Sequence, residues 1–226
     1  MQGSTFGQYE TMGAKFVKAV LMIALVYVLP LLARPHLLVS AQVLLMALVS
    51  VLVVLMQPDV SFKGAARDRT LDQRSLLVVL IPSLLAYALP VIEWAYFPHS
   101  LPALVATALE YLGVIVITAA LTLRVWAILT LGHMFTATPR IVEDHEFVDK
   151  GPYRVLRHPS YAGAYFVLIG SALLFNALMA LALIALLMLW AYSRRINKEE
   201  RVLKEHFGPV YAEYCSRSWR MFPLIW

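Results

Sequence analysis

Long apolar stretches separated by short polar segments dominate this chain. A helix needs about 20 apolar residues to cross the roughly 30 Å hydrocarbon core of a bilayer. The pattern therefore predicts an all-α protein, a polytopic bundle of membrane helices. The predicted apolar stretches lie at about residues 16–33, 37–56, 75–97, 102–131 and 162–192.

The last stretch is longer than one crossing requires and carries Asn176 near its centre. Asparagine tolerates turn conformations, and the small residues on either side of Asn176 allow two helices to pack closely. We therefore expect a C-terminal helical hairpin that turns at Asn176. The total is then five or six membrane helices, depending on whether the hairpin counts as one or two.

From Arg194 the chain becomes charged but keeps the apolar spacing of an amphipathic helix. Gly208-Pro209 is expected to end that helix, and a second short helix through Tyr211 and Tyr214 is expected to follow. The aromatic residues at the end of the chain suit a membrane interface. This tail is therefore predicted to lie against the membrane rather than to span it.

Composition supports a membrane protein. Hydrophobic residues make up 61% of the chain and charged residues 15%, whereas soluble domains have about 45–50% apolar and about 25% charged residues. The length of 226 residues favours a single domain, 1–226. Its N-terminal membrane helices fall in 1–131, and a polar loop, the hairpin and the amphipathic tail fall in 132–226.

The formal net charge of +5 suits cytoplasmic loops and anionic lipid rather than nucleic acid, since no basic and aromatic residues alternate as in a nucleic-acid module. If the loops 57–74 and 132–159 and the tail lie on one side of the membrane, nearly all Lys and Arg residues lie on that side. This predicts that both termini are cytoplasmic, in a prokaryotic inner membrane or an endoplasmic reticulum-type membrane. The oligomeric state is not indicated.

Three ionisable residues fall inside predicted membrane helices: Glu93, Glu110 and Arg124. Such groups usually face a cavity or a partner, because charge is costly in the bilayer. Glu110 and Arg124 share nearly one helix face but lie about 21 Å apart along the axis, so they cannot pair. Arg124 is a candidate substrate-binding residue.

The polar segment 145–163, HEFVDKGPYRVLRHPSYAG, is the main candidate for a functional site. Gly151, Pro152 and Pro159 make it a poor helix, and its dense hydrogen-bond donors favour an ordered ligand-binding loop. Singly, His145 and His158 are as well explained as surface residues in turns; together with their neighbours they indicate function. No metal site is predicted, because the spacing matches no zinc pattern.

The sequence motifs of several other enzyme classes are absent from this chain. The chain has no Gly-x-Gly-x-x-Gly turn after a strand and no Walker loop, which argues against soluble dinucleotide-binding and phosphate-binding folds. It also lacks the Gly-x-Ser-x-Gly of serine hydrolases.

In three places the chain resembles the isoprenylcysteine carboxyl methyltransferase family, within the wider group of membrane methyltransferases that includes phospholipid N-methyltransferases. The matching text is LGHMF at 131–135, H-x-x-V-x-x-G-x-Y-x-x-x-R-H-P-S-Y-x-G at 145–163 and R-x-x-x-E-E-x-x-L-x-x-x-F-G at 195–208. Tyr211, Tyr214 and the R-x-x-P at 220–223 extend it. The resemblance covers about the C-terminal half.

This resemblance implies a cytoplasmic pocket for S-adenosylmethionine, closed by the tail. It makes Arg195 and Glu199 the catalytic candidates, at the junction with a lipid substrate that enters from the bilayer. Arg124 and Arg217 are the substrate-binding candidates, and Arg217 and Arg220 are equally well explained as lipid-headgroup anchors. The cofactor-binding candidates are His145, Val148, Gly151, Tyr153, Arg157, His158, Pro159, Tyr161 and Glu200.

The expected reaction is methyl transfer to a carboxylate of a lipid-like acceptor such as a prenylated cysteine, with Arg195 holding the carboxylate. With an amine acceptor, Glu199 becomes the candidate base. Three alternatives remain open: a phospholipid or small-molecule methyltransferase of the same fold, an NADPH-dependent membrane lipid reductase, and a non-enzymatic scaffold or transporter.

Overall fold

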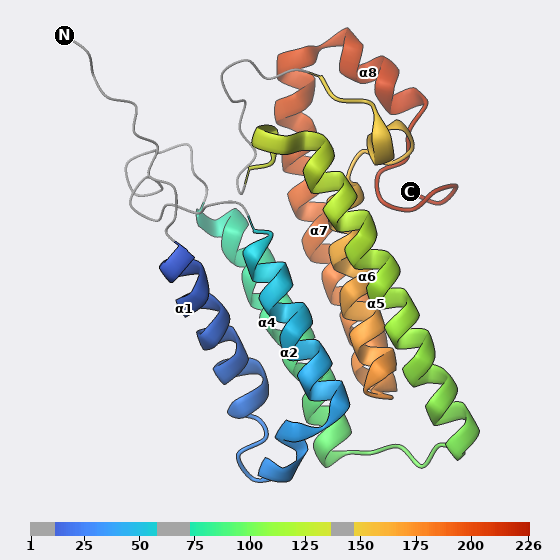
Figure 1. Ribbon diagram of the computed structural model, residues 1–226. Coiled ribbons are helices and arrows are strands. Elements are labelled where there is room, and N and C mark those ends of the chain that lie inside the picture. Colours follow the sequence, from blue (N-terminus) through green and yellow to red (C-terminus); the bar gives the residue numbers. More distant parts are fainter. Residues whose placement is uncertain (1–11, 58–72, 137–146) are drawn as a thin grey trace, which may run out of the picture.

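Helices of very different length make up the computed structural model, which describes residues 12–57, 73–136 and 147–226 (Figure 1). Within these residues the only strand-like pairing is an isolated bridge between Leu156 and Trp219, so the all-helical prediction is confirmed for this part of the chain. The α-helices are α1 (Met12–Ile23), α2 (Ala41–Leu55), α4 (Gln73–Tyr96), α5 (Ala103–Leu131), α6 (Pro159–Leu174), α7 (Leu178–Phe207) and α8 (Pro209–Ser216). Short helical turns are η1 (Ala24–Val28), η2 (Pro35–Val39), η3 (Gly132–Met134) and η4 (Gly151–Arg154).

Three helices of the described part are long and apolar enough to cross a membrane: Leu77–Tyr96, Ala103–Met134 and Leu178–Phe207. The helices α2 and α6 are apolar but shorter. The chain is therefore a multi-pass membrane protein. The predicted total of five or six membrane helices stays a prediction.

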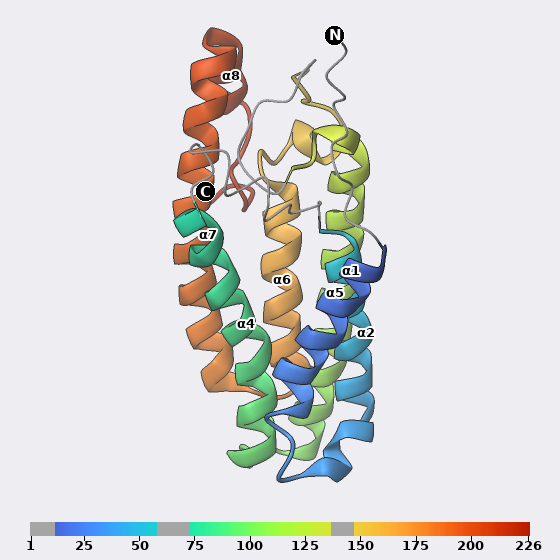
Figure 2. The same cartoon turned by 90° about the vertical axis from the view of Figure 1, so that its left-hand side faces the viewer.

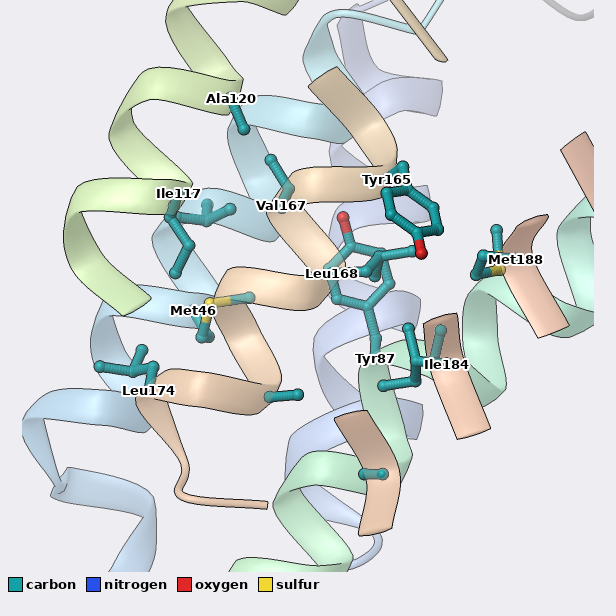
Figure 3. Close-up of a cluster of buried hydrophobic side chains, with 14 of the residues drawn as sticks. Met46, Tyr87, Ile117, Ala120, Tyr165, Val167, Leu168, Leu174, Ile184 and Met188 are labelled. Atoms are coloured by element: carbon teal, nitrogen blue, oxygen red, sulfur yellow. The ribbon is translucent and has the colours of Figure 1, made fainter. Parts of the chain in front are cut away.

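The helix α6 lies at the centre of the bundle, between α5 and α7 (Figure 2). Buried side chains from α2, α4, α5, α6 and α7 meet in one apolar cluster, part of which Figure 3 shows. Met46, Tyr87, Ile117, Leu168 and Ile184 represent the five helices in that cluster. The loop 147–158, α8 and the tail lie together at one end of this core (Figure 1).

Close contact between α5 and α6 depends on glycine. A Cβ atom on Gly163 would lie 2.8 Å from the Ala120 carbonyl oxygen and 2.8 Å from Arg124 Cβ. A Cβ atom on Gly113 would lie 2.5 Å from the backbone nitrogen of Leu174. Because only glycine fits at these positions, the start of α6 is held directly against Arg124 of α5.

The predicted hairpin is confirmed. The helix α6 ends at Leu174, Asn176 takes a positive φ of 53°, and α7 begins at Leu178. Residues after Arg194 continue α7 without a break, and Gly208, at φ 53°, ends it before α8 begins at Pro209. Both the predicted stop and the predicted short helix through Tyr211 and Tyr214 are therefore confirmed.

Two membrane glutamates hold the turn of the hairpin. Glu93 of α4 accepts hydrogen bonds from the backbone N–H groups of Met179 (3.0 Å) and Ala180 (2.6 Å), and it also contacts His99. Glu93 therefore caps the N-terminus of α7, where a helix leaves N–H groups unsatisfied and favours negative charge. Glu110 of α5 accepts one hydrogen bond from the Asn176 amide at 3.2 Å.

We expect substitutions of Glu93 and Glu110 to cause different losses of stability. Glu93→Gln should lower the free energy of unfolding by about 1–2 kcal/mol, because it removes the charge from a cap that two N–H groups share. Glu110→Gln should have a smaller effect, since a glutamine oxygen can still accept the single Asn176 bond. Thermal unfolding in detergent measures both. A larger loss for Glu110→Gln than for Glu93→Gln would contradict the capping role.

Candidate active site

The loop 147–158 is irregular apart from the single turn η4, as Gly151 and Pro152 predicted. The prediction was wrong for residues 159–163, which form the start of α6, because proline is well accommodated at the first position of a helix. Gly151 has a φ of +58°, which favours glycine, and a Cβ atom there would lie 3.0 Å from Thr130 Oγ1 and 3.3 Å from Trp126 Nε1. The loop therefore packs against the end of α5. Tyr153 is buried beneath it.

The tail is paired with the end of this loop. The backbone N–H of Arg157 donates to the Trp219 carbonyl at 2.7 Å, and that of His158 donates to the Arg220 carbonyl at 2.9 Å. Trp219 donates in return to Val155 at 2.9 Å. The tail thus closes over the loop at the beginning of α6, as the resemblance implied.

Arg157, Glu200 and Arg220 form an ionic group that we call the Glu200 cluster. Arg157 Nε donates to Glu200 Oε1 at 2.9 Å, and Arg220 donates to Glu200 Oε2 at 2.7 Å. Arg157 also donates to the carbonyl oxygens of Cys215 and Ser218. Both oxygens of the Glu200 carboxylate are therefore bound by guanidinium groups that tie the loop, α7 and the tail together.

Glu200 stays ionised under all ordinary conditions. It lies 22 residues after the start of α7, which is about 33 Å along the helix axis and so beyond a hydrocarbon core of about 30 Å. Burial acts to raise the pKa of its carboxyl group, but the neighbouring His158, Arg157 and Arg220 outweigh burial and lower the pKa to about 2.

Arg195, Glu199 and Tyr161 meet on the neighbouring face of α7. The Tyr161 hydroxyl donates to Glu199 Oε2 at 2.9 Å and accepts from Arg195 Nε at 3.2 Å. The ring of Tyr161 lies between the rings of His158, at a centroid distance of 5.7 Å, and Tyr192, at 5.3 Å. The structure thus brings both catalytic candidates into contact with one candidate of the loop.

His158 lies between the two carboxylates of α7. Its side chain is buried, with Nδ1 3.9 Å from Glu199 Oε1 and Nε2 3.5 Å from Glu200 Oε1. Pro159, also buried, follows it as the first residue of α6. His158 is therefore the side chain that connects the Glu200 cluster with the Tyr161 group.

An aromatic group covers the other side of the loop. Phe147 packs edge-on against Phe207 and Tyr214, with centroid distances of 5.4 and 5.1 Å. The Tyr214 hydroxyl donates to the Tyr153 carbonyl at 2.6 Å. Burial raises the pKa of the Tyr153, Tyr211 and Tyr214 hydroxyls, so these phenols stay neutral.

Arg124 approaches the site from α5. It is only 4% exposed, and one of its terminal nitrogens donates to the Ser160 carbonyl at 2.8 Å and to Ser160 Oγ at 3.0 Å. Within the part of the chain that the structure describes, no carboxylate pairs with this guanidinium group. A buried cation without a counter-ion favours an anionic ligand.

The remaining candidates lie apart from this centre. Arg217 is exposed at the surface and donates to Asp149 at 2.7 Å, so its predicted contact with substrate stays a prediction. Val148 is half-buried at the beginning of the loop. His145 lies outside the described residues.

Buried polar atoms of the described residues that lack hydrogen-bond partners lie around the loop. Arg124 Nε and the Tyr211 hydroxyl are buried around the loop and have no hydrogen-bond partner in the described part, and buried His158 Nε2 has only its 3.5 Å contact with Glu200. Unsatisfied polar atoms are costly unless a ligand binds them. S-Adenosylmethionine carries a carboxylate, hydroxyl groups and ring nitrogens that can satisfy such atoms. The same described residues contain no group of three metal-ligating side chains.

Two residues of the site were not among the predicted catalytic, cofactor-binding or substrate-binding residues, although Arg220 was predicted as a possible lipid-headgroup anchor. Arg220 closes the Glu200 cluster, and Tyr211 places its unsatisfied hydroxyl in the interior. Both occur in the motif text at the end of the chain, which is the signal that could have identified them.

Comparison with known proteins confirms the family resemblance for the C-terminal half. Residues 112–205 match the model of the isoprenylcysteine carboxyl methyltransferase (ICMT) family. A probable protein-S-isoprenylcysteine O-methyltransferase of Oryza sativa is 33% identical over 120 residues, which are 51% of this chain and 62% of that protein. Protein-S-isoprenylcysteine O-methyltransferase B of Arabidopsis thaliana is 37% identical over 108 residues, 46% of this chain and 54% of that protein. The chain thus spans less than two thirds of the length of these relatives.

The fold extends the similarity to nearly the whole chain. A solved structure of a eukaryotic intramembrane Ras methyltransferase, ICMT, superposes with a TM-score of 0.64 at 24% identity. The match covers 97% of this chain and 79% of the other. The helices before residue 112 therefore share the arrangement of that fold as well.

Proposed function

Because residues 112–205 are an ICMT-family segment set in that family's fold, we propose that this protein is a membrane methyltransferase that uses S-adenosylmethionine. The acceptor is a carboxylate on a lipid-like molecule such as a prenylated cysteine. The observation that carries the proposal is the contact of Arg195 and Glu199 with Tyr161, where α6 and α7 meet. All 226 residues act as one domain, and the site and both termini face the cytoplasm.

Arg195 is proposed to bind the acceptor. Its side chain is buried at the level where the charged part of α7 begins. A planar guanidinium group can hold a carboxylate through two parallel hydrogen bonds, which fixes the direction of the reacting oxygen. Arg124 supplies a second buried positive charge from α5, and it favours an anionic group of either the acceptor or the donor.

Residues of the loop are proposed to bind the cofactor. Tyr153, His158 and Pro159 are buried and Tyr161 is partly buried, and the unsatisfied polar atoms lie around these candidates. Glu199, which accepts a hydrogen bond from Tyr161, is proposed to meet the cationic end of the cofactor. Glu200, by contrast, is engaged by Arg157 and Arg220, and its predicted contact with the cofactor stays a prediction.

Methyl transfer to a carboxylate requires the protein mainly to position the donor and the acceptor. When bound, S-adenosylmethionine supplies a methyl group carried on a positively charged sulfur. A carboxylate acceptor has no proton to lose, so Arg195 needs only to orient it, while the partly buried ring of Tyr161 and the buried ring of Tyr192 exclude water. Orientation of this kind can contribute about 7–11 kcal/mol. With an amine acceptor, Glu199 would have to accept a proton.

Two measurements test the proposal. Calorimetric titration of the purified protein with S-adenosylmethionine and with NADPH should show binding of the first alone, since a lipid reductase would bind the second. Incubation with labelled donor should then transfer label to a prenylated cysteine as an alkali-labile ester. The matched control is the same prenylated cysteine with its carboxylate converted to an amide. Equal labelling of acid and amide, or binding of NADPH only, would refute the proposal.

A further inference from the structure

A charged pocket of about 440 Å³ opens on α7, on the side away from Arg195 and Tyr161. Asn197, Arg201 and Lys204 recur at helical spacing and so form one face of α7. Arg220 of the tail also lines the pocket. The lining residues are Asn197, Glu200, Arg201, Lys204, Glu205 and Arg220.

The pocket has an excess of positive charge that the protein does not satisfy. Both oxygens of Glu200 are bound by Arg157 and Arg220. Among the described residues, neither the Arg201 nor the Lys204 side chain takes part in a hydrogen bond or an ion pair. Glu205 is then the one lining carboxylate outside the Glu200 cluster, against the two unpaired cations Arg201 and Lys204 in the same lining.

We propose that this pocket binds the phosphate group of an anionic ligand. Arg201 and Lys204 supply donors that no protein acceptor satisfies, and an amide donor is available from Asn197. Charge-assisted hydrogen bonds from Arg and Lys to phosphate oxygens are stronger than neutral ones. A phosphate matches this donor set, because it offers several oxygens at once.

The end of the tail points to a phospholipid headgroup as the source of the phosphate. Leu224 and Ile225 are 83% and 82% exposed, next to Trp226, whose ring stacks under Arg220 with the cation 5.5 Å from its centroid. Figure 1 shows this tail turned back from α8 toward the helix bundle. Exposed aliphatic residues beside Trp and Arg are typical of the membrane interface, where headgroups lie.

The test compares lipid binding by the full-length protein and two double variants of equal charge. Arg201→Gln with Lys204→Gln removes the two unpaired cations of the pocket. Lys150→Gln with Arg154→Gln is the control, because both are exposed in the loop, have no side-chain partner among the described residues and do not line the pocket. Native mass spectrometry counts the phosphatidylglycerol and phosphatidylcholine that each protein retains.

The unmodified protein and the control should retain phosphatidylglycerol in preference to phosphatidylcholine. The pocket variant should bind phosphatidylglycerol about 30-fold more weakly, since each cation near an anionic surface contributes about 1 kcal/mol. Equal retention by all three proteins, or an equal loss in the control, would overturn the lipid assignment.

A second experiment distinguishes a phospholipid headgroup from a free phosphate compound as the ligand of the pocket. Calorimetric titration with inorganic phosphate in a neutral detergent measures binding of the free anion at low and high salt. Salt-sensitive binding that the pocket variant alone loses, without selective lipid retention, would assign the pocket to a soluble phosphate compound. Failure of both lipid and phosphate to distinguish the pocket variant from the control would disprove the proposal. Neither readout depends on methyl transfer.

Discussion

Arg195→Ala is expected to lower kcat/KM for a carboxylate acceptor by about 100-fold to 1000-fold, because loss of one partner of a buried charge pair costs roughly 2–5 kcal/mol. Arg195 is buried and contacts the Tyr161 hydroxyl, which keeps its hydrogen bond to Glu199 in the variant. The affinity for S-adenosylmethionine should therefore remain unchanged. Initial rates with labelled donor, together with calorimetric titration of the donor, separate the two effects.

Arg194, the neighbour of Arg195 in the chain, provides the control. Arg194 is exposed and stacks over the Trp190 ring at 5.4 Å, so Arg194→Ala removes the same charge from the same helix turn without changing the site. Arg195→Lys should fall between wild type and Arg195→Ala, because lysine keeps the charge but cannot make a planar bidentate contact. Turnover of Arg195→Ala equal to that of Arg194→Ala would disprove the assignment.

Local patterns were sufficient to predict the elements that carry the site. Asn176 between small residues predicted the hairpin, and Gly208-Pro209 predicted the end of α7. Gly151 and Pro152 predicted the irregular path of the loop, whereas Pro159 begins α6. These features depend on conformational preferences of single residues and their neighbours, which the sequence shows directly.

The partners of charged residues were not predictable in the same way. Glu93 caps a helix that begins 85 positions later in the chain, and only the packing of α4 against α7 brings the two together. Adjacent Glu199 and Glu200 point in directions about 100° apart around the helix, so Glu199 bonds Tyr161 and Glu200 bonds Arg157, and only His158 lies near both. The buried side chains of Ile184 and Met188 fix the rotation of α7, and that rotation turns Glu199 toward Tyr161.

Glu200→Ala is expected to lower the free energy of unfolding by about 3 kcal/mol and the thermal midpoint by roughly 6–12 °C. The substitution leaves Arg157 in a largely buried position without its counter-ion, while Arg220 is more exposed and can be solvated. The tail should also become sensitive to protease, since Arg220 loses its ionic contact with α7. Thermal unfolding and limited proteolysis in detergent measure these effects.

Glu205→Ala removes the same charge one turn further along α7 from an exposed side chain, and it should leave the midpoint within about 1 °C, as for surface substitutions in general. Glu200→Gln separates charge from shape, because its amide can accept from only one guanidinium group; its loss should be intermediate. Donor affinity then distinguishes the two roles of Glu200. A stable Glu200→Ala protein with weakened binding of S-adenosylmethionine would make Glu200 a cofactor ligand, whereas an unstable protein that still binds the donor at low temperature would identify the Glu200 cluster as the contact that holds the tail over the site.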